Sequence, residues 1–235
     1  MKKIAIALLP FQIILSCNGQ DAKNTYTQKL EFGLKGPIKE VTSYLCRSKD
    51  GNTQIDTTKS IAKIVMKFDT LGDVTTIDKK WDFGESGNSK YLSVFSGKGK
   101  NLSFKETSRI GEGEIHETNY KYVWSDDYNY KIIAPEDDEY ITDVTLDENY
   151  RLIKSTFKID NRTQSIEEFD IKIENDKIKE VKTKVTANNG GKQEVTEQIQ
   201  VVQEYDHHGN PTVLYVYNDL NEQIKHVLYK RYKYY

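Results

Sequence analysis

The stretch Tyr205-Asp206-His207-His208-Gly209-Asn210 indicates a β-strand that ends in a tight reversal. Its Asp side chain can accept hydrogen bonds from backbone N–H groups just ahead of it, and Gly and Asn tolerate the positive φ that short hairpin connections need. An apolar run over 213–217 follows, then a polar reversal over 218–221 and a last strand-like run over 224–234. This order predicts consecutive antiparallel hairpins at the end of the chain.

A second copy of this layout lies upstream, at Phe68-Asp69-Thr70-Leu71-Gly72-Asp73. At these two places the sequence resembles the tyrosine-aspartate repeats of bacterial cell-surface proteins, which stack hairpins into large curved β-sheets and shells. The resemblance implies a β scaffold with a structural or enclosing role. It implies no catalytic residue.

The segments between the turn signals have the alternation of strands with one apolar face, as in the run 168–173. The alternation slips over 178–181 and at Val201-Val202, where a β-bulge would restore the register. Pro135 and the acidic run after it predict a seam between two halves of the sheet, because proline within strands is confined to edges and ends.

These signals predict a single all-β domain over 37–235, an antiparallel meander of roughly a dozen strands. A sheet with one apolar face must cover that face. The meander is therefore expected to curl into a barrel or half-barrel, or to fold over as a sandwich, and consecutive hairpins favour the curled forms.

The composition fits such a sheet. The hydrophobic share is 37%, below the roughly 45–50% of average globular proteins, and charged residues make up 30%. Disorder is excluded by the 16 Tyr, 8 Phe and 2 Trp, because disordered chains lack aromatic residues. We expect a thin core, with each strand apolar on one face and charged on the other.

The N-terminus has the three parts of a secretory signal: Lys2 and Lys3, a mostly apolar run over 4–15, and a small residue at the expected cleavage site. The ending Ile14-Leu15-Ser16-Cys17 resembles the lipobox of bacterial lipoproteins. The resemblance implies a signal peptide over 1–16, acylation of Cys17 with chains such as palmitate, and a lipid-anchored polar tether over 17–36. An ordinary signal peptide with a chance cysteine is the alternative. By resemblance to enterobacterial lipoproteins, Asn18 after the cysteine, in place of Asp, implies the outer membrane or cell surface as the location.

Cleavage before Cys17 removes two lysines and lowers the net charge from −2 to −4. Nucleic-acid binding needs clustered Lys and Arg, so nucleic acid is excluded as a partner. With Cys17 used by the lipid, Cys46 has no intrachain partner. We interpret Cys46 as a small, half-buried apolar residue in preference to a reactive thiol.

The motifs that carry chemistry in other proteins are missing from the sequence. The four histidines, His116, His207, His208 and His226, do not have the spacing of a zinc site. There is no Gly-x-Ser-x-Gly elbow and no phosphate-binding loop. We therefore predict no catalytic residue, no cofactor and no metal.

Tyrosine is the one residue in excess, and it is densest near the C-terminus, at Tyr229, Tyr232 and Tyr234. These rings are either a binding surface or the filling of the sheet's inner face. We expect a membrane-anchored, non-enzymatic lipoprotein whose β-sheet surface binds a protein, glycan or lipid, in an immunity-type or carrier role. The alternative is a surface or periplasmic hydrolase whose site forms only in three dimensions.

Overall fold

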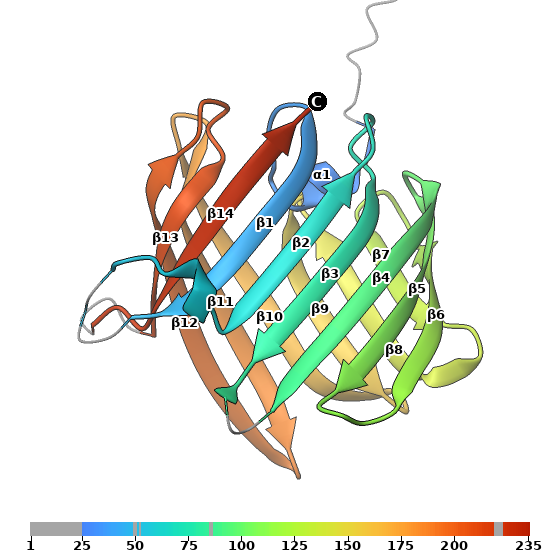
Figure 1. The fold of residues 1–235 in the computed structure, drawn as a ribbon. Coiled ribbons are helices and arrows are strands. Elements are labelled where there is room, and N and C mark those ends of the chain that lie inside the picture. The colour runs from blue at the N-terminus through green and yellow to red at the C-terminus, as the bar shows by residue number, and fades with distance from the viewer. Residues whose placement is uncertain (1–24, 49–50, 52, 85–86, 219–222) are drawn as a thin grey trace, which may run out of the picture.

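The strands form one closed antiparallel barrel (Figure 1). The computed structural model describes residues 25–235 except 49–50, 52, 85–86 and 219–222. Fourteen strands occur within this described part, and each pairs with the next along the chain. The predicted all-β antiparallel meander is therefore confirmed, and of the forms expected it takes the closed barrel.

The strands are β1 (Ile38–Arg47), β2 (Ala62–Phe68), β3 (Val74–Asp82), β4 (Asn88–Lys98), β5 (Asn101–Ile110), β6 (Ile115–Trp124), β7 (Asn129–Ala134), β8 (Asp137–Leu146), β9 (Leu152–Ile159), β10 (Arg162–Glu174), β11 (Lys177–Asn189), β12 (Lys192–Tyr205), β13 (Pro211–Tyr217) and β14 (His226–Tyr234). Before them comes the helical turn α1 (Gln28–Glu31), and the 3₁₀ turn η1 (Thr57–Lys59) lies between β1 and β2. No helix in the described residues is long and apolar enough to cross a membrane.

The barrel closes where the first strand meets the last. β1 pairs with β14 from Ile38↔Tyr234 to Arg47↔His226. The seam expected at Pro135 is wrong, because β7 and β8 pair directly across that residue. Pro135 lies in the short turn between them, where no ladder hydrogen bond is required of it.

Both predicted irregularities in the alternation are β-bulges. In the β10–β11 ladder Lys172 pairs with Glu180 and Ile173 with Ile178, so Lys179 is the extra residue. In the β12–β13 ladder the register shifts between Val202 and Glu204. Each bulge returns apolar side chains to the inner face after the slip.

One turn type recurs at the end of the barrel that holds α1, the upper end in Figure 1. The two predicted copies, over 69–73 and 206–210, share a pattern in which the first residue's N–H donates to the fifth residue's carbonyl, at 2.8 and 2.9 Å. A third copy spans 147–151, at 2.8 Å. In all three the leading Asp carboxylate accepts two or more backbone N–H groups, and the fourth residue has a positive φ.

The core is concentrated at this same end, in two clusters. One contains Tyr26 with Leu102, Tyr130, Val144 and Leu146, and the other contains Leu34 with Ile38, Val41, Phe68 and Val74. Residues 26–36, which we call the N-terminal plug, contribute a buried side chain to each cluster. The predicted tether ran to residue 36, but its last part is folded inside the barrel end.

The outer face of the wall is charged. Cross-strand ion pairs lie along it, such as Lys105–Glu117 at 2.8 Å and Lys158–Asp143 at 2.5 Å. Exposed pairs of this kind contribute about 0–1 kcal/mol each, so they account for little of the stability. The free energy of folding comes mainly from the apolar inner face and the plug.

The closing ladder predicts a specific cross-link. Thr42 and Arg231 are directly paired across β1 and β14. Paired residues of antiparallel strands have Cα atoms about 4.5–5.5 Å apart, within the range of a disulfide. In a background without Cys17 and Cys46, Thr42→Cys with Arg231→Cys should form a disulfide nearly completely on mild oxidation, measured by mass spectrometry.

The matched control keeps Thr42→Cys and places the second cysteine at Lys105 on β5, which does not pair with β1. That pair should stay reduced within one molecule. Equal cross-linking of the two pairs, or none in the first, would contradict closure of the barrel between its first and last strands.

Candidate functional site

The plug is held by buried amide side chains. Gln28 is 2% exposed; its Oε1 accepts the backbone N–H of Val74 at 2.8 Å and its Nε2 donates to the hydroxyl of Tyr122 at 3.2 Å. Asn210 is 1% exposed; its Oδ1 accepts the N–H of Lys35 at 2.8 Å and its Nδ2 donates to the carbonyl of the same residue at 3.0 Å. The plug is therefore fixed at both ends to the recurring turns and the strands that leave them.

A buried carboxylate lies at the end of α1. The hydroxyls of Tyr26 and Tyr130 donate to Glu31 Oε2 and Oε1 at 2.5 and 2.8 Å. Burial raises the pKa of Glu31, and the two phenol hydrogen bonds oppose part of that rise. Burial also raises the pKa of Tyr26, so the hydroxyls stay protonated as donors. These three residues join the plug to Tyr130 on β7, within the core cluster that contains Tyr26.

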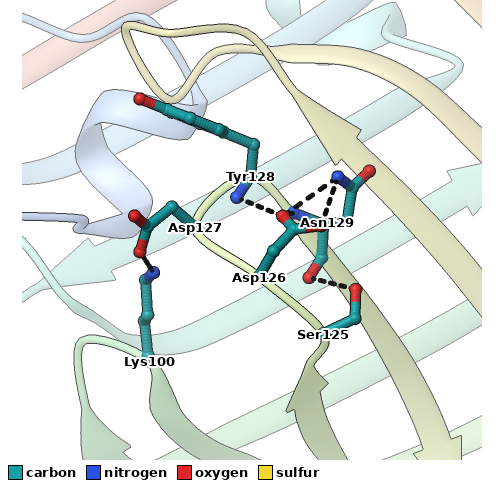
Figure 2. A network of polar contacts seen from close by, with 6 residues as sticks. All are labelled: Lys100, Ser125, Asp126, Asp127, Tyr128 and Asn129. Carbon is teal, nitrogen blue, oxygen red and sulfur yellow. Dashed lines mark hydrogen bonds and ion pairs between the residues drawn. The ribbon is translucent and has the colours of Figure 1, made fainter.

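The turn over 125–129 packs against the core cluster that contains Tyr26, through the side chain of Tyr128. Figure 2 shows the polar contacts of this turn. Its Asp126 carboxylate accepts the N–H groups of Tyr128 and Asn129, both at 2.8 Å, as Figure 2 shows. Lys100 Nζ pairs with Asp127 at 2.7 Å and lies 4.7 Å from the ring centroid of Trp124. Trp124 in turn packs edge-on against the plug's tyrosine, at 4.7 Å between centroids.

A cavity of about 160 Å³, which we call the inner cavity, lies directly against the plug. The plug forms one side of it through residues 31–34, and strands β9 to β14 form the rest. The strand side is mostly apolar, with Phe169, Ile171 and Leu214 among its residues. The ionisable residues that line the whole cavity are Glu31, Arg151, Lys230 and Tyr232.

A second cavity of about 380 Å³ adjoins the first at the rim of the barrel. The two share Gly33, Leu34, Arg151 and Ile178 as lining residues. The rim cavity is also bordered by Lys35, whose ammonium pairs with Asp176 at 2.5 Å. The shared residues make the two cavities neighbours, with the C-terminal part of the plug beside both.

The ionisable groups of the inner cavity differ in how they are satisfied. Arg151 donates from Nε at 2.8 Å to Asp147 Oδ2 and pairs with it through Nη2 at 2.7 Å. Glu31 is bound by its two phenols, and the hydroxyl of Tyr232 donates to the carbonyl of Pro211 at 2.7 Å. Within the described residues no hydrogen bond or ion pair reaches the ammonium of Lys230.

Lys230 is enclosed by the barrel wall yet keeps part of its surface open, because it borders the cavity. Burial alone lowers the pKa of Lys230 to about 8. Its cross-strand partner on β1 is Ser43, which is 8% exposed. Sequence reasoning missed this lysine, although it alternates with Tyr232 and Tyr234 and so belongs to the same face.

The three predicted tyrosines are not brought together on one surface. Tyr232 and Tyr234 stack on the inner face, with centroids 6.4 Å apart. Tyr234 donates its hydroxyl to the carboxylate of Asp206 and accepts from Asn210 at 2.9 Å, so it supports the turn over 206–210. Tyr229 stacks instead on Tyr44, with centroids 6.4 Å apart. Only Tyr232 of the three lines the inner cavity.

The remaining candidates have structural surroundings. Cys17 lies outside the described residues. Cys46 is 5% exposed, its thiol faces the carbonyl of Asp56 at 3.6 Å, and burial raises its pKa. His207 and His208 lie against each other and against Tyr234. Across the part of the chain that the structure covers, no three His, Cys, Asp or Glu side chains are grouped to hold a metal ion.

Comparison with protein families, with curated proteins and with solved structures found no match to this chain. The features that bear on function are therefore those of the barrel itself. They are an apolar cavity, a plug that closes it on one side, and a lysine that faces it without a partner.

The plug contacts predict a stability effect for Gln28→Ala. The substitution leaves the buried N–H of Val74 and the hydroxyl of Tyr122 without their partner. A buried polar group left unpaired costs about 1–3 kcal/mol, so the free energy of unfolding should fall by at least about 2 kcal/mol. Urea unfolding followed by tryptophan fluorescence measures it.

Gln203→Ala is the control, because Gln203 is exposed on β12 and its amide bonds only to a neighbouring carbonyl. That variant should unfold within about 0.5 kcal/mol of the parent protein. An equal effect of the two substitutions would show that the plug contributes no more to stability than a surface side chain.

Proposed function

We propose that this chain is a lipid-anchored, non-enzymatic binding protein whose barrel takes up a small apolar ligand beside the plug. The cavity of about 160 Å³ carries the proposal. Ligand sites are concave and mostly apolar, with a few placed polar groups, and this cavity has that composition. Of the partners expected from the sequence, an apolar or lipid-like molecule suits it best.

The width of the barrel explains why such a space exists. A barrel of about eight strands is just filled by its own side chains or holds one small ligand, and the diameter grows with strand number. Here the plug and the core cluster that contains Tyr26 fill much of the barrel end that holds α1. The volume of the inner cavity is close to the about 150 Å³ of an apolar cavity that binds benzene.

Two of the ionisable groups of the cavity, Glu31 and Arg151, support binding in preference to catalysis. A hydrolase needs a carboxylate, histidine or nucleophile free to exchange protons with its substrate. Both oxygens of Glu31 accept phenol hydroxyls, and Arg151 is paired with Asp147. These contacts serve to hold the plug and the turn in place.

The position of the plug also supports a particular orientation at the membrane. The chain enters the barrel at the α1 end, and only residues 18–25 separate the plug from Cys17. Eight residues span at most about 30 Å when fully extended. An acylated Cys17 would therefore keep the plugged end near the surface of a bacterial outer membrane, with the opposite end directed away.

Replacement of Cys17 by serine tests the anchor. If the thiol carries the acyl chains, Cys17→Ser should move the protein almost entirely from the detergent phase to the aqueous phase in Triton X-114 partitioning. Several acyl chains give stable anchoring at about 0.8 kcal/mol per buried CH₂, which accounts for the size of the change. Cys46→Ser is the matched control and should leave partitioning unchanged. Membrane association that survives loss of Cys17 would contradict the anchor.

Filling the cavity tests the ligand site. Val181 lines the inner cavity, and Trp in its place should occupy most of the space. Binding of benzyl alcohol, followed by chemical shift changes, should then weaken at least tenfold. Val195→Trp adds the same ring on β12 at a residue that is 55% exposed, and it should bind like the parent protein. No binding by the parent protein, or equal binding by both variants, would contradict a ligand site in the barrel.

A further inference from the structure

Lys230 is the one ionisable group of the inner cavity that the protein leaves unsatisfied. Its side chain lines the cavity from β14 and is half-buried. Taking an ammonium out of water costs several kcal/mol unless a counter-charge and hydrogen bonds compensate. No compensating group is found among the described residues, although many lysines on the outer face have partners.

Every other charged or titratable group around Lys230 is already engaged. On the plug, Glu31 is bound by two phenols, and at the start of β9 Arg151 is held by Asp147. On β14 the hydroxyl of Tyr232 donates to a carbonyl. The strands β10, β11 and β13 present apolar side chains to the cavity, and β12 presents the amide of Gln200. The ammonium therefore faces a mostly apolar space and forms no ion pair, and Glu31, the one carboxyl group that lines the cavity, is hydrogen-bonded to Tyr26 and Tyr130 instead.

We propose that this cavity binds an apolar monocarboxylate whose carboxylate pairs with the ammonium of Lys230. The hydrocarbon part of the acid, an aromatic ring or a short chain, packs against Phe169, Ile171 and Leu214. The inference rests on the proposed function of the cavity and names the ligand class. A ligand of this kind supplies an anion that pairs directly with the ammonium and apolar atoms that fill the space.

The charge and size of the site favour a monocarboxylate over other anions. A phosphate or sulfate group is bound by several donors or by a bidentate guanidinium, and Arg151 already binds a carboxylate. One ammonium balances one negative charge. The cavity of about 160 Å³ admits a benzene-sized group, and the adjoining rim cavity gives a longer acid room to extend past Gly33 and Leu34.

A pair of nearly identical probes tests the proposal by titration calorimetry at pH 7. Phenylacetate carries the charge, and phenylacetamide has the same ring and a neutral amide. The parent protein should bind phenylacetate at least tenfold more tightly than phenylacetamide. In Lys230→Met the affinity for phenylacetate should fall at least tenfold, while that for phenylacetamide should change by less than threefold.

Lys233→Met is the control on the same strand. Its ammonium pairs with Glu40 at 2.8 Å and its side chain is 70% exposed, so its loss should leave both affinities unchanged. Lys230→Met also removes a buried charge, which should preserve or increase the melting temperature. Weaker binding of phenylacetate by a variant that melts no lower than the parent protein cannot be attributed to unfolding.

The pH dependence gives an independent readout. Only the protonated amine pairs with a carboxylate, and burial lowers the pKa of free Lys230 to about 8. Phenylacetate affinity should therefore be constant just below pH 7 and fall by up to tenfold per pH unit above 8. Lys230→Met should lose this decline. The Lys230→Met variant keeps Glu31, Arg151 and Tyr232. Burial raises the pKa values of Glu31 and Tyr232. Any pH dependence of binding that these residues cause is therefore retained in the variant.

The outcomes separate the inference from the proposed function. Equal binding of phenylacetate and phenylacetamide, both unaffected by Lys230→Met, would overturn the carboxylate site. The barrel would still be a binding protein if benzyl alcohol binds and Val181→Trp abolishes it. If none of the three probes binds, the proposed function and the inference fall together.

Discussion

The structure depends on the plug and its hydrogen bonds to the recurring Asp turns. A closed sheet of this width has an inner face that its own side chains do not fill. Tyr26 and Leu34 supply the missing apolar surface to the two core clusters. Their places are set by Gln28 and Asn210, whose amides pair with backbone groups that would otherwise be buried without partners. The barrel wall and the plug are therefore stable together.

The plug also determines which polar groups are compatible with the interior. It brings a carboxylate of its own, and Tyr26 and Tyr130 are positioned to bind it. The turns provide carboxylates that bind backbone N–H groups and Arg151. Among the ionisable groups that line the inner cavity, the ammonium of Lys230 is the exception, because no hydrogen bond or ion pair reaches it within the described residues. Exceptions to local consistency in folded proteins concentrate at functional sites, and on that ground we place the ligand there.

Local features of the fold could be predicted from the sequence, and long-range ones could not. The turns over 69–73 and 206–210 and the bulges near Lys179 and Val202 follow from residue types and period-2 alternation. The plug has the composition of a linker, and nothing in its sequence reveals that buried turns accept it. The seam was expected at Pro135, because local rules mark where a ladder weakens but not where distant strands meet.

The plug, the closure of the barrel and Lys230 lie at one place in the fold. The plug leads directly into β1, β1 closes the barrel by pairing with β14, and Lys230 lies in that ladder opposite Ser43. A ligand bound to Lys230 and packed against the plug contacts β14 and the segment that leads into β1. A ligand that binds only the folded form stabilises it by RT ln(1 + [L]/Kd). Uptake and closure would then be coupled, and the loaded barrel would be the more stable form.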